Sequence, residues 1–234
     1  MKEIKKIVEK IDGWLSGEEG KLLYNLARNC KGNGVIVEVG SWKGKSTVWL
    51  GKGSKGGSNV KIYAVDPHSG SSEIKESYGE IQSYEDFKSN IKKAKIDDII
   101  VPIVKTSEEA AKNFDEPIEL IFIDGAHEYD FVKLDFELWF PKVIKGGIMV
   151  FHDTVGYDGP KNVIKKYIFN SKNFRKINFV DSITYAEKTT QNSAKDRLRN
   201  QYIFFLKCIY DFGYGLNLPQ PLRIIGRKLA KLIQ

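Results

Sequence analysis

Short apolar runs alternate along the chain with longer stretches in which apolar residues recur every three or four positions. The runs rich in β-branched residues are 35–39, 60–65, 99–104, 118–123 and 148–151. Runs of this length and composition are typical of parallel strands buried on both faces, and the stretches between them are typical of amphipathic helices. The alternation predicts an α/β fold with a mostly parallel sheet.

Two helices are predicted ahead of the first strand. Apolar residues have helical spacing over residues 2–12, and Ser16 with Glu19 three residues later forms a capping box that starts a second helix. The segment 13–15 between them has two interpretations. It lines the entrance of a ligand site, or it is a helix–helix turn with Trp14 packed into the core.

Turn signals and periodicity place the remaining elements. Residues 51–59 are rich in Lys, Gly and Ser and predict a surface loop, and the Gly146-Gly147 pair predicts a turn before the fifth strand. Helices are predicted to open at Ser46 and to cover residues 84–91, 128–140 and 160–168. A hairpin of 176–180 and 183–187 adds an antiparallel pair of strands.

Composition is that of an ordinary globular protein. The chain has 234 residues, of which 41% are hydrophobic and 29% charged. The N-terminus leads into no apolar signal core, and no run approaches the roughly 20 apolar residues of a spanning helix. We therefore expect a cytoplasmic protein. Cys30 and Cys208 have no metal-binding or redox spacing, so we expect buried thiols.

The net charge of +7 lies almost entirely in the last segment. Residues 195–234 contain eight basic and two acidic residues. The body is therefore close to neutral and lacks the basic character of a nucleic-acid reader, so no nucleic-acid partner is expected. The tail also carries aromatic residues and helical apolar spacing. Three interpretations stay open: peripheral contact with the inner surface of a membrane, a homodimer contact, or packing against the body.

A glycine turn follows the first strand. Glu38, Gly40 and Gly44 read E-x-G-x-x-x-G, and a helix opens at Ser46. A strand, a glycine turn and a helix N-terminus let the backbone approach a ligand closely. A phosphate-binding P-loop, G-x-x-x-x-G-K-[ST], has four residues between its glycines, one more than separate Gly40 and Gly44. A dinucleotide fingerprint is disfavoured because Trp42 stands where a glycine is needed.

Acidic and imidazole side chains follow the later strands. Asp66 ends the second strand, where a carboxylate can accept hydrogen bonds from both hydroxyls of a ribose; the alternative is a simple turn residue. Asp124 and His127 follow the fourth strand, and His152 with Asp153 follows the fifth. Because the carboxyl ends of parallel strands meet at one edge of a sheet, these side chains are expected to lie close together there. Carboxylates and imidazoles in such a group can bind a metal ion, so a metal site is one interpretation.

Residues 13–188 resemble the class I S-adenosylmethionine (SAM)-dependent methyltransferases. The resemblance is to the branch that contains macrolide-sugar and rhamnosyl O-methyltransferases and cephalosporin hydroxylase-like proteins. The segments that carry it are EVGSWKGKS at 38–46, VD at 65–66, FIDGAHEY at 122–129 and GGIMVFHDT at 146–154. The resemblance implies a Rossmann-like, seven-stranded sheet, mostly parallel with an antiparallel last strand.

The resemblance also implies a role for each site residue. Cofactor contacts are expected from four places. The glycine turn contributes Glu38, Gly40, Ser41, Gly44 and Ser46, and Asp66 binds the ribose. Thr106 and Ser107 form the adenine corner, the part of the site beside the adenine, and Asp124 follows the fourth strand. Mg²⁺ or another divalent cation is expected on Asp124, His152 and Asp153. Position 152 holds a carboxylate in metal-dependent relatives, so this chain departs from the pattern there. His127 is expected as the general base, with Asp124 beside it.

The implied organisation has three parts. Residues 1–32 are N-terminal helices at the entrance, 33–190 form the SAM-binding domain, and 195–234 form a basic amphipathic tail. The expected function is O-methylation of a sugar or glycan hydroxyl. The alternatives are an oxidative role like that of the hydroxylase-named relatives, a SAM-binding protein without turnover, and a P-loop-like nucleotide binder.

Overall fold

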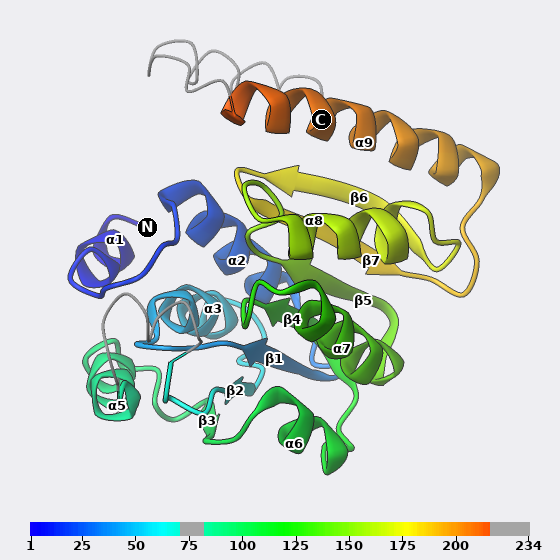
Figure 1. Ribbon diagram of the computed structural model, residues 1–234. Helices are drawn as coiled ribbons and strands as arrows, with labels where there is room; N and C mark the ends of the chain where they lie inside the picture. The colour runs from blue at the N-terminus through cyan, green and yellow to red at the C-terminus, as the bar shows by residue number, and fades with distance from the viewer. Residues whose placement is uncertain (71–81, 216–234) are drawn as a thin grey trace.

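A mixed β-sheet with helices on both faces organises the molecule (Figure 1), and the computed structural model describes residues 1–70 and 82–215. The described strands are β1 (Val35–Val39), β2 (Ile62–Val65), β3 (Ile100–Ile103), β4 (Ile118–Ile123), β5 (Val143–Phe151), β6 (Phe174–Val180) and β7 (Ile183–Lys188). They form one seven-stranded sheet in the order β3-β2-β1-β4-β5-β7-β6. Only β7 runs antiparallel to its neighbours, which confirms the predicted fold class.

Helices cover both faces of the sheet. Successive strand residues point to opposite faces, and both sets are apolar, so each face is buried under a layer of helices. One layer contains α1 (Lys2–Val8), α2 (Gly17–Asn29), α3 (Lys45–Lys55) and α5 (Tyr84–Lys93). The other contains α6 (Ser107–Lys112), α7 (Tyr129–Trp139), the short η1 (Phe140–Lys142), α8 (Asp158–Val163), the π-helix η2 (Ile164–Phe169) and α9 (Ala194–Gly215). In β1, Val35, Val37 and Val39 pack toward the second layer and Ile36 toward the first.

The predicted start of α2 is confirmed, and a second helix starts in the same way. Ser16 caps α2 and forms the expected capping box with Glu19. Thr106 caps α6 and forms a second box with Glu109. Each box satisfies two backbone N–H groups that have no partner inside the helix, so the first turn is fixed by local sequence alone.

The surface loop predicted at 51–59 is wrong in its first half, because α3 continues to Lys55. Glycine serves there for close packing instead of a turn. A Cβ atom at Gly53 would lie 2.3 Å from the carbonyl oxygen of Tyr24 in α2, and one at Gly51 would lie 2.7 Å from Ile96 Cδ1. The two helices therefore approach more closely than any larger residue would allow.

Two further predictions need correction. The turn predicted at Gly146-Gly147 lies inside β5, which begins at Val143 and changes register against β4 between Val143 and Ile148. Gly146 adopts a φ of +85° within this irregularity. Cys30 is buried as expected, but Cys208 is exposed on α9, because its side of the helix faces away from β6.

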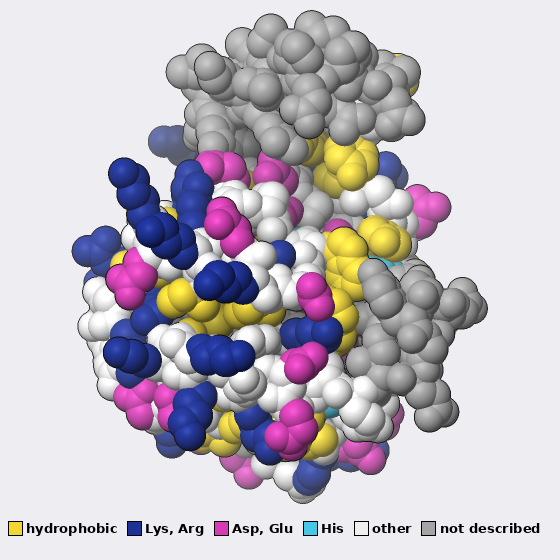
Figure 2. Space-filling model, turned by 90° about the vertical axis from the view of Figure 1, so that its left-hand side faces the viewer, with side chains coloured by type: hydrophobic (Ala, Val, Ile, Leu, Met, Phe, Trp, Pro, Cys, Tyr) yellow, Lys and Arg dark blue, Asp and Glu magenta, His cyan; other side chains and the backbone are white. Residues whose placement is uncertain are grey.

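Charge on the molecular surface is mixed. Figure 2 views the side of α1 and α5, where Lys and Arg side chains are spread across the face with Asp and Glu side chains between them. Among the described residues, no helix is both long enough and apolar enough to cross a membrane.

Glu38 is a carboxyl group in the middle of the core. It sits in β1 with no exposed surface and accepts a hydrogen bond from Thr47 Oγ1 of α3 at 2.5 Å. Burial raises its pKa to about 8, against hydrogen bonds from Ser46 and Thr47 that lower it. The folded chain therefore keeps a proton on Glu38 that the unfolded chain releases near pH 4.5.

Replacing Glu38 by Gln should change how stability depends on pH. Between pH 4.5 and 8 the folded state binds the extra proton, so wild-type stability falls as the pH rises through this window. The Glu38→Gln variant lacks this contribution. From pH 5 to pH 8 the wild type should lose at least about 1.4 kcal/mol more than the variant in urea unfolding, which corresponds to one pKa unit. Glu85→Gln, which removes an exposed carboxylate, should behave like the wild type. Equal losses in wild type and Glu38→Gln would contradict the shift.

Candidate active site

A cleft of about 1220 Å³ opens at the carboxyl ends of β1, β2, β4 and β5. This is the edge where open parallel sheets bind ligands. Most residues predicted for the site line it: Gly40, Ser41, Ser46, Asp66, Thr106, Ser107, Asp124, His127, His152 and Asp153. Glu38 and Gly44 do not. Glu38 lies behind the wall, where it supports the first turn of α3, and Gly44 is the N-cap of that helix.

The glycine turn after β1 is fixed by a close contact with β4. Gly40 adopts a φ of +87°, and a Cβ atom on it would lie 2.0 Å from the carbonyl oxygen of Asp124. No side chain can be accommodated there. The turn is thereby held directly against the end of β4, which carries the predicted metal-site and catalytic acid.

Ser41 in the turn and Ser46 at the start of α3 are both buried in the cleft wall and line it. Ser46 also hydrogen-bonds to Glu38 behind the wall. Ser41 Oγ has no hydrogen-bond partner among the described residues. Since a buried hydroxyl without a partner is costly, this atom is a candidate ligand contact.

Asp66 lies at the end of β2 with its carboxylate oriented by backbone. Its Oδ2 accepts from the N–H of Trp42 and its Oδ1 from the N–H of His68, both at 2.6 Å. Each oxygen keeps a lone pair toward the cleft side. The contact also holds Trp42, whose φ of +40° is unusual for a non-glycine residue.

The predicted adenine corner is built by α6 and α7. Thr106 and Ser107 line the cleft, and Ser107 Oγ accepts from Trp139 Nε1 at 2.8 Å. Asp135 of α7 also lines this corner and was not predicted. Burial raises the pKa of Asp135 to about 6, against a hydrogen bond from Ser107 that lowers it.

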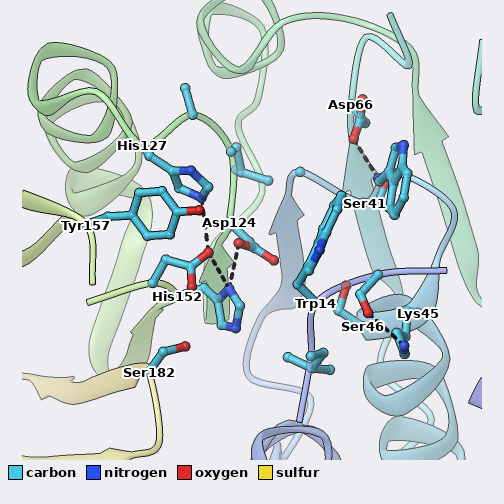
Figure 3. Close-up of a pocket in the computed structure, with 18 of the residues that line it drawn as sticks. Trp14, Ser41, Lys45, Ser46, Asp66, Asp124, His127, His152, Tyr157 and Ser182 are labelled. Atoms are coloured by element: carbon cyan, nitrogen blue, oxygen red, sulfur yellow. Dashed lines mark hydrogen bonds and ion pairs between the residues drawn. The ribbon is translucent and has the colours of Figure 1, made fainter. Parts of the chain in front are cut away.

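At the other end of the cleft, the buried ring of His152 lies beside Asp124 (Figure 3), and two further carboxylates approach the ring. Its Nδ1 lies 2.9 Å from Asp124 Oδ1 and 3.1 Å from Asp153 Oδ2, and its Nε2 lies 3.5 Å from Glu19 Oε2. Burial alone would lower the pKa of His152, but the three carboxylates hold it well above its usual range. Burial would raise the pKa of Asp153, but its contacts with His127 and His152 hold that pKa below its usual range.

His127 faces this cluster from the loop that precedes α7. Its Nε2 lies 3.0 Å from Asp153 Oδ2, and its ring lies 4.0 Å from the ring of Tyr157. Asp153 is thus shared by both histidines. Its φ of +51° shows that the backbone is held in an uncommon conformation to place this carboxylate.

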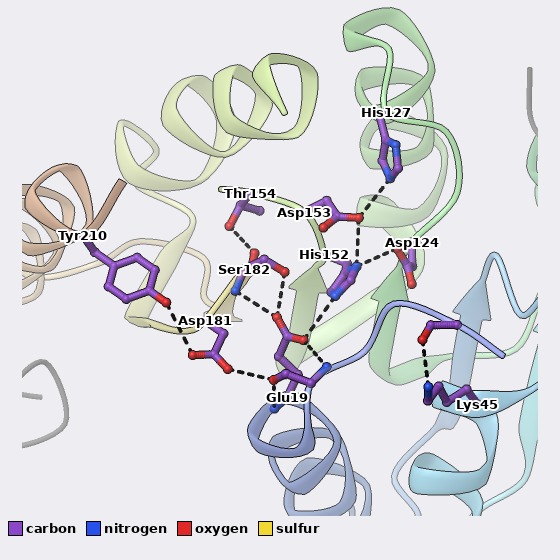
Figure 4. A network of polar contacts seen from close by, with 12 residues as sticks. Glu19, Lys45, Asp124, His127, His152, Asp153, Thr154, Asp181, Ser182 and Tyr210 are labelled. Carbon is purple, nitrogen blue, oxygen red and sulfur yellow. Dashed lines mark hydrogen bonds and ion pairs between the residues drawn. The ribbon is translucent and has the colours of Figure 1, made fainter. Parts of the chain in front are cut away.

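A polar network ties Glu19 into the site (Figure 4). Its Oε1 accepts from both the N–H and the hydroxyl of Ser182 in the β6–β7 turn, at 2.9 and 2.7 Å. Next to it, Asp181 accepts from Ser16 Oγ at 2.7 Å and from the hydroxyl of Tyr210 in α9 at 3.4 Å. The network joins α2, the hairpin and α9 around one buried imidazole.

Aromatic rings stand at the cleft mouth. Trp14, which Figure 3 draws in the cleft, is 61% exposed, and its ring stacks on Trp42 with centroids 4.9 Å apart. The loop that carries it is fastened to α3, because Lys45 Nζ donates to the carbonyl of Gly13 at 2.7 Å. The segment 13–15 therefore lines the entrance, in agreement with the first of its two interpretations.

Sequence reasoning missed the parts of the site that depend on distant segments. Glu19 was recognised only as a helix cap, although it also contacts His152. Tyr210 and Tyr214 reach the cleft from α9, and Tyr157 from the loop after β5. Exposed aromatic residues in a polar loop were the available signal for Tyr157. Nothing local marks Glu19, since its partner lies in another layer of the fold.

Comparison with known proteins agrees with this geometry. A family model described as a methyltransferase domain matches residues 37–154, from β1 to the loop after β5. An uncharacterised protein of Acanthamoeba polyphaga mimivirus is 30% identical over 141 residues, which cover 58% of this chain and 59% of that protein. A second relative, from Sinorhizobium fredii, is 43% identical over 51 residues, which cover 21% of this chain and 6% of that protein. The chain thus spans well under two thirds of either relative.

Solved structures share the fold at low sequence identity. A protein from Corynebacterium glutamicum superimposes with a TM-score of 0.62 at 15% identity, over 82% of this chain and 92% of that one. The O-methyltransferase TomG from Streptomyces achromogenes, solved with SAM, gives a TM-score of 0.57 at 18% identity, over 80% and 86%. Together with the family match, which spans half of the chain, these findings show that the chain belongs to the methyltransferase-domain family, with the class I fold of SAM-dependent methyltransferases.

Proposed function

We propose that the chain is a SAM-dependent O-methyltransferase that acts on a hydroxyl group of a sugar or glycan. The observation that carries the proposal is one cleft with two chemically different ends. The glycine turn and Asp66 form one end, and the His127–Asp153 pair forms the other. A methyl donor and a hydroxyl acceptor need such adjacent sites, because the transfer is an in-line displacement.

At the cofactor end, the buried polar atoms of the wall suit SAM. Ser41 Oγ supplies a hydrogen bond to the methionine part, and Asp66 accepts from the ribose hydroxyls. Thr106, Ser107 and Asp135 surround the adenine, where the Asp135 carboxyl accepts from the exocyclic amino group. SAM supplies an electrophilic methyl group, and the chain's part is to fix its direction.

At the acceptor end, His127 takes the proton from the attacking hydroxyl. Asp153, at 3.0 Å from Nε2, holds the ring in one orientation and stabilises the imidazolium that forms. An imidazole suits this task because its ordinary pKa is close to neutral. The exposed rings of Trp14 and Tyr157 in the cleft provide flat apolar surfaces for the C–H face of a sugar.

The donor set around His152 also fits a divalent cation. Asp124, His152 and Asp153 each offer one ligand atom, and these atoms lie within 4.8 Å of one another. Glu19 beside Nε2 matches the carboxylate that commonly orients a metal-bound histidine from behind. Binding through Nδ1 requires loss of the ring proton, so affinity would rise with pH. Such an ion would lower the pKa of a bound hydroxyl.

Calorimetric titration with S-adenosylhomocysteine tests the cofactor end. The wild type should bind one equivalent, and Asp66→Ala should bind at least about tenfold more weakly, because hydrogen bonds to a charged acceptor contribute about 1.5–3 kcal/mol. Asp98→Ala removes an exposed carboxylate far from the cleft and is the matched control. Unchanged affinity in Asp66→Ala excludes the ribose role. No binding by folded wild type overturns the cofactor assignment.

Replacing His127 by Ala tests the base. Methyl transfer to a panel of free and nucleotide-linked hexoses, followed through S-adenosylhomocysteine release, should slow by about 100-fold or more. Affinity for S-adenosylhomocysteine and the melting temperature should stay at wild-type values, since the side chain is on the acceptor side. A variant that retains the wild-type rate rules out His127 as the base.

Chelation tests the cation. Prior treatment with EDTA should lower the transfer rate at least about tenfold, and added Mg²⁺ or Mn²⁺ should restore it, because a bound cation contributes several kcal/mol to such steps. The Asp124→Asn variant should respond less to added metal. A rate that is insensitive to EDTA removes the metal from the mechanism and leaves the His127–Asp153 pair.

A further inference from the structure

The outer face of α9 carries a continuous stripe of exposed apolar side chains. These are Leu198, Tyr202, Phe205, Ile209 and Phe212, and each is between 47% and 76% exposed. Their spacing of four and three residues keeps them on one side of the helix. At 1.5 Å per residue the stripe is about 21 Å long. A contiguous surface of this kind on a folded chain marks an interaction site.

The opposite face of α9 fixes the helix on the body, so the stripe cannot be buried by rolling the helix. Ile203 is packed in the core cluster beside β6. Lys207 is 2% exposed and donates to the carbonyl of Thr154 at 2.7 Å and to Asp211 at 3.0 Å. Asn200 Nδ2 donates to the carbonyl of Phe174 at 3.1 Å. The helix is therefore held in one orientation, and the stripe stays exposed on the surface of the folded protein.

Basic residues border the stripe at one end. The two acidic residues of α9, Asp196 and Asp211, are only partly exposed and lie on the other side of the helix. Lys195 and Arg197 are exposed and flank its N-terminal end. The 19 residues that follow α9 in the sequence contain four basic residues and no acidic one. An apolar surface bordered by basic residues matches an anionic bilayer.

A second copy of the chain fits the stripe less well. The stripe consists of five side chains on one helix. Each partner of a stable specific interface contributes about 20–30 residues. Phe and Leu residues, which are common on the apolar face of helices that lie in a membrane interface, make up most of the stripe. Size and composition both favour a membrane over a dimer.

We propose that the outer face of α9 binds peripherally to a lipid bilayer with anionic headgroups. The apolar stripe inserts at the level of the headgroups and the upper acyl chains, and Lys195 and Arg197 contact the headgroups. This proposal is independent of the proposed methyl transfer, because it concerns a surface outside the catalytic cluster.

Cys208 provides a probe on this surface in the unaltered protein. It is exposed and flanks the stripe, whereas Cys30 is buried and burial raises the pKa of its thiol to about 12. An environment-sensitive thiol dye should therefore label Cys208 selectively. Vesicles of three parts phosphatidylcholine to one part phosphatidylglycerol should shift the dye emission to the blue. Vesicles of phosphatidylcholine alone should give at least about a fivefold weaker response, since each basic residue contributes about 1 kcal/mol at an anionic surface.

Sedimentation of unlabelled full-length protein with the same vesicles gives the second readout. Phe205→Ser together with Phe212→Ser should reduce the bound fraction at least about fivefold, because apolar area that enters the bilayer is lost. Val104→Ser is the matched control, since Val104 is an exposed apolar residue at the β3 edge of the sheet. It should bind as the wild type does, and the melting temperatures of all variants confirm folding.

The outcomes separate the possible occupants. Binding that depends on anionic lipid and on the stripe supports the proposal. Folded wild type that binds neither vesicle, or binds both equally, overturns it. A concentration-dependent dimer that the double variant dissolves, without vesicle binding, assigns the face to a second copy instead. If the double variant does not fold, the dye response of the labelled wild type to the two vesicle types decides the question.

Discussion

The contact between the buried imidazole of His152 and three carboxylates holds the active end of the molecule together. Glu19, Asp124 and Asp153 come from α2, β4 and the end of β5, and each lies within 3.5 Å of the ring. Three carboxylates this close together, with Glu19 buried and the two aspartates half-buried, would repel one another without a cation. A positive group at their centre is therefore a condition for the N-terminal helices to dock over the strand ends. The cleft is a consequence of this docking.

Much of the fold and of the cleft follows from the sequence because the signals are local. A parallel strand that ends in Asp66, Asp124 or Asp153 places its acid at a common edge, whatever the details of packing. The capping box at Ser16 fixes a helix start in the same way. The α/β fold could be predicted from such features, and the seven-stranded methyltransferase sheet from the family resemblance that the glycine turn and the later strand ends carry.

The remainder could not be predicted because it depends on contacts between layers. The glycines at 51 and 53 resemble those of a loop, and only the closeness of α2 and Ile96 shows that they permit helix packing. The capping box fully explains why a Glu stands at position 19, so the sequence gives no reason to expect its second contact, with His152. Exposure of Cys208 depends on which face of α9 meets β6, and this is a tertiary property.

The walls of the cleft belong to different parts of the chain, and this separation bears on how the protein can diversify. The glycine turn is sterically closed, since Gly40 is pressed against the backbone at Asp124 and tolerates no side chain. The opposite wall is formed by the loop at Tyr157 and the inner face of α9. These segments contribute side chains from an exposed loop and a peripheral helix, where exchange is least costly. Substitutions in the wall of loop and helix can therefore change which acceptor binds, while the glycine turn that faces the methyl donor stays the same.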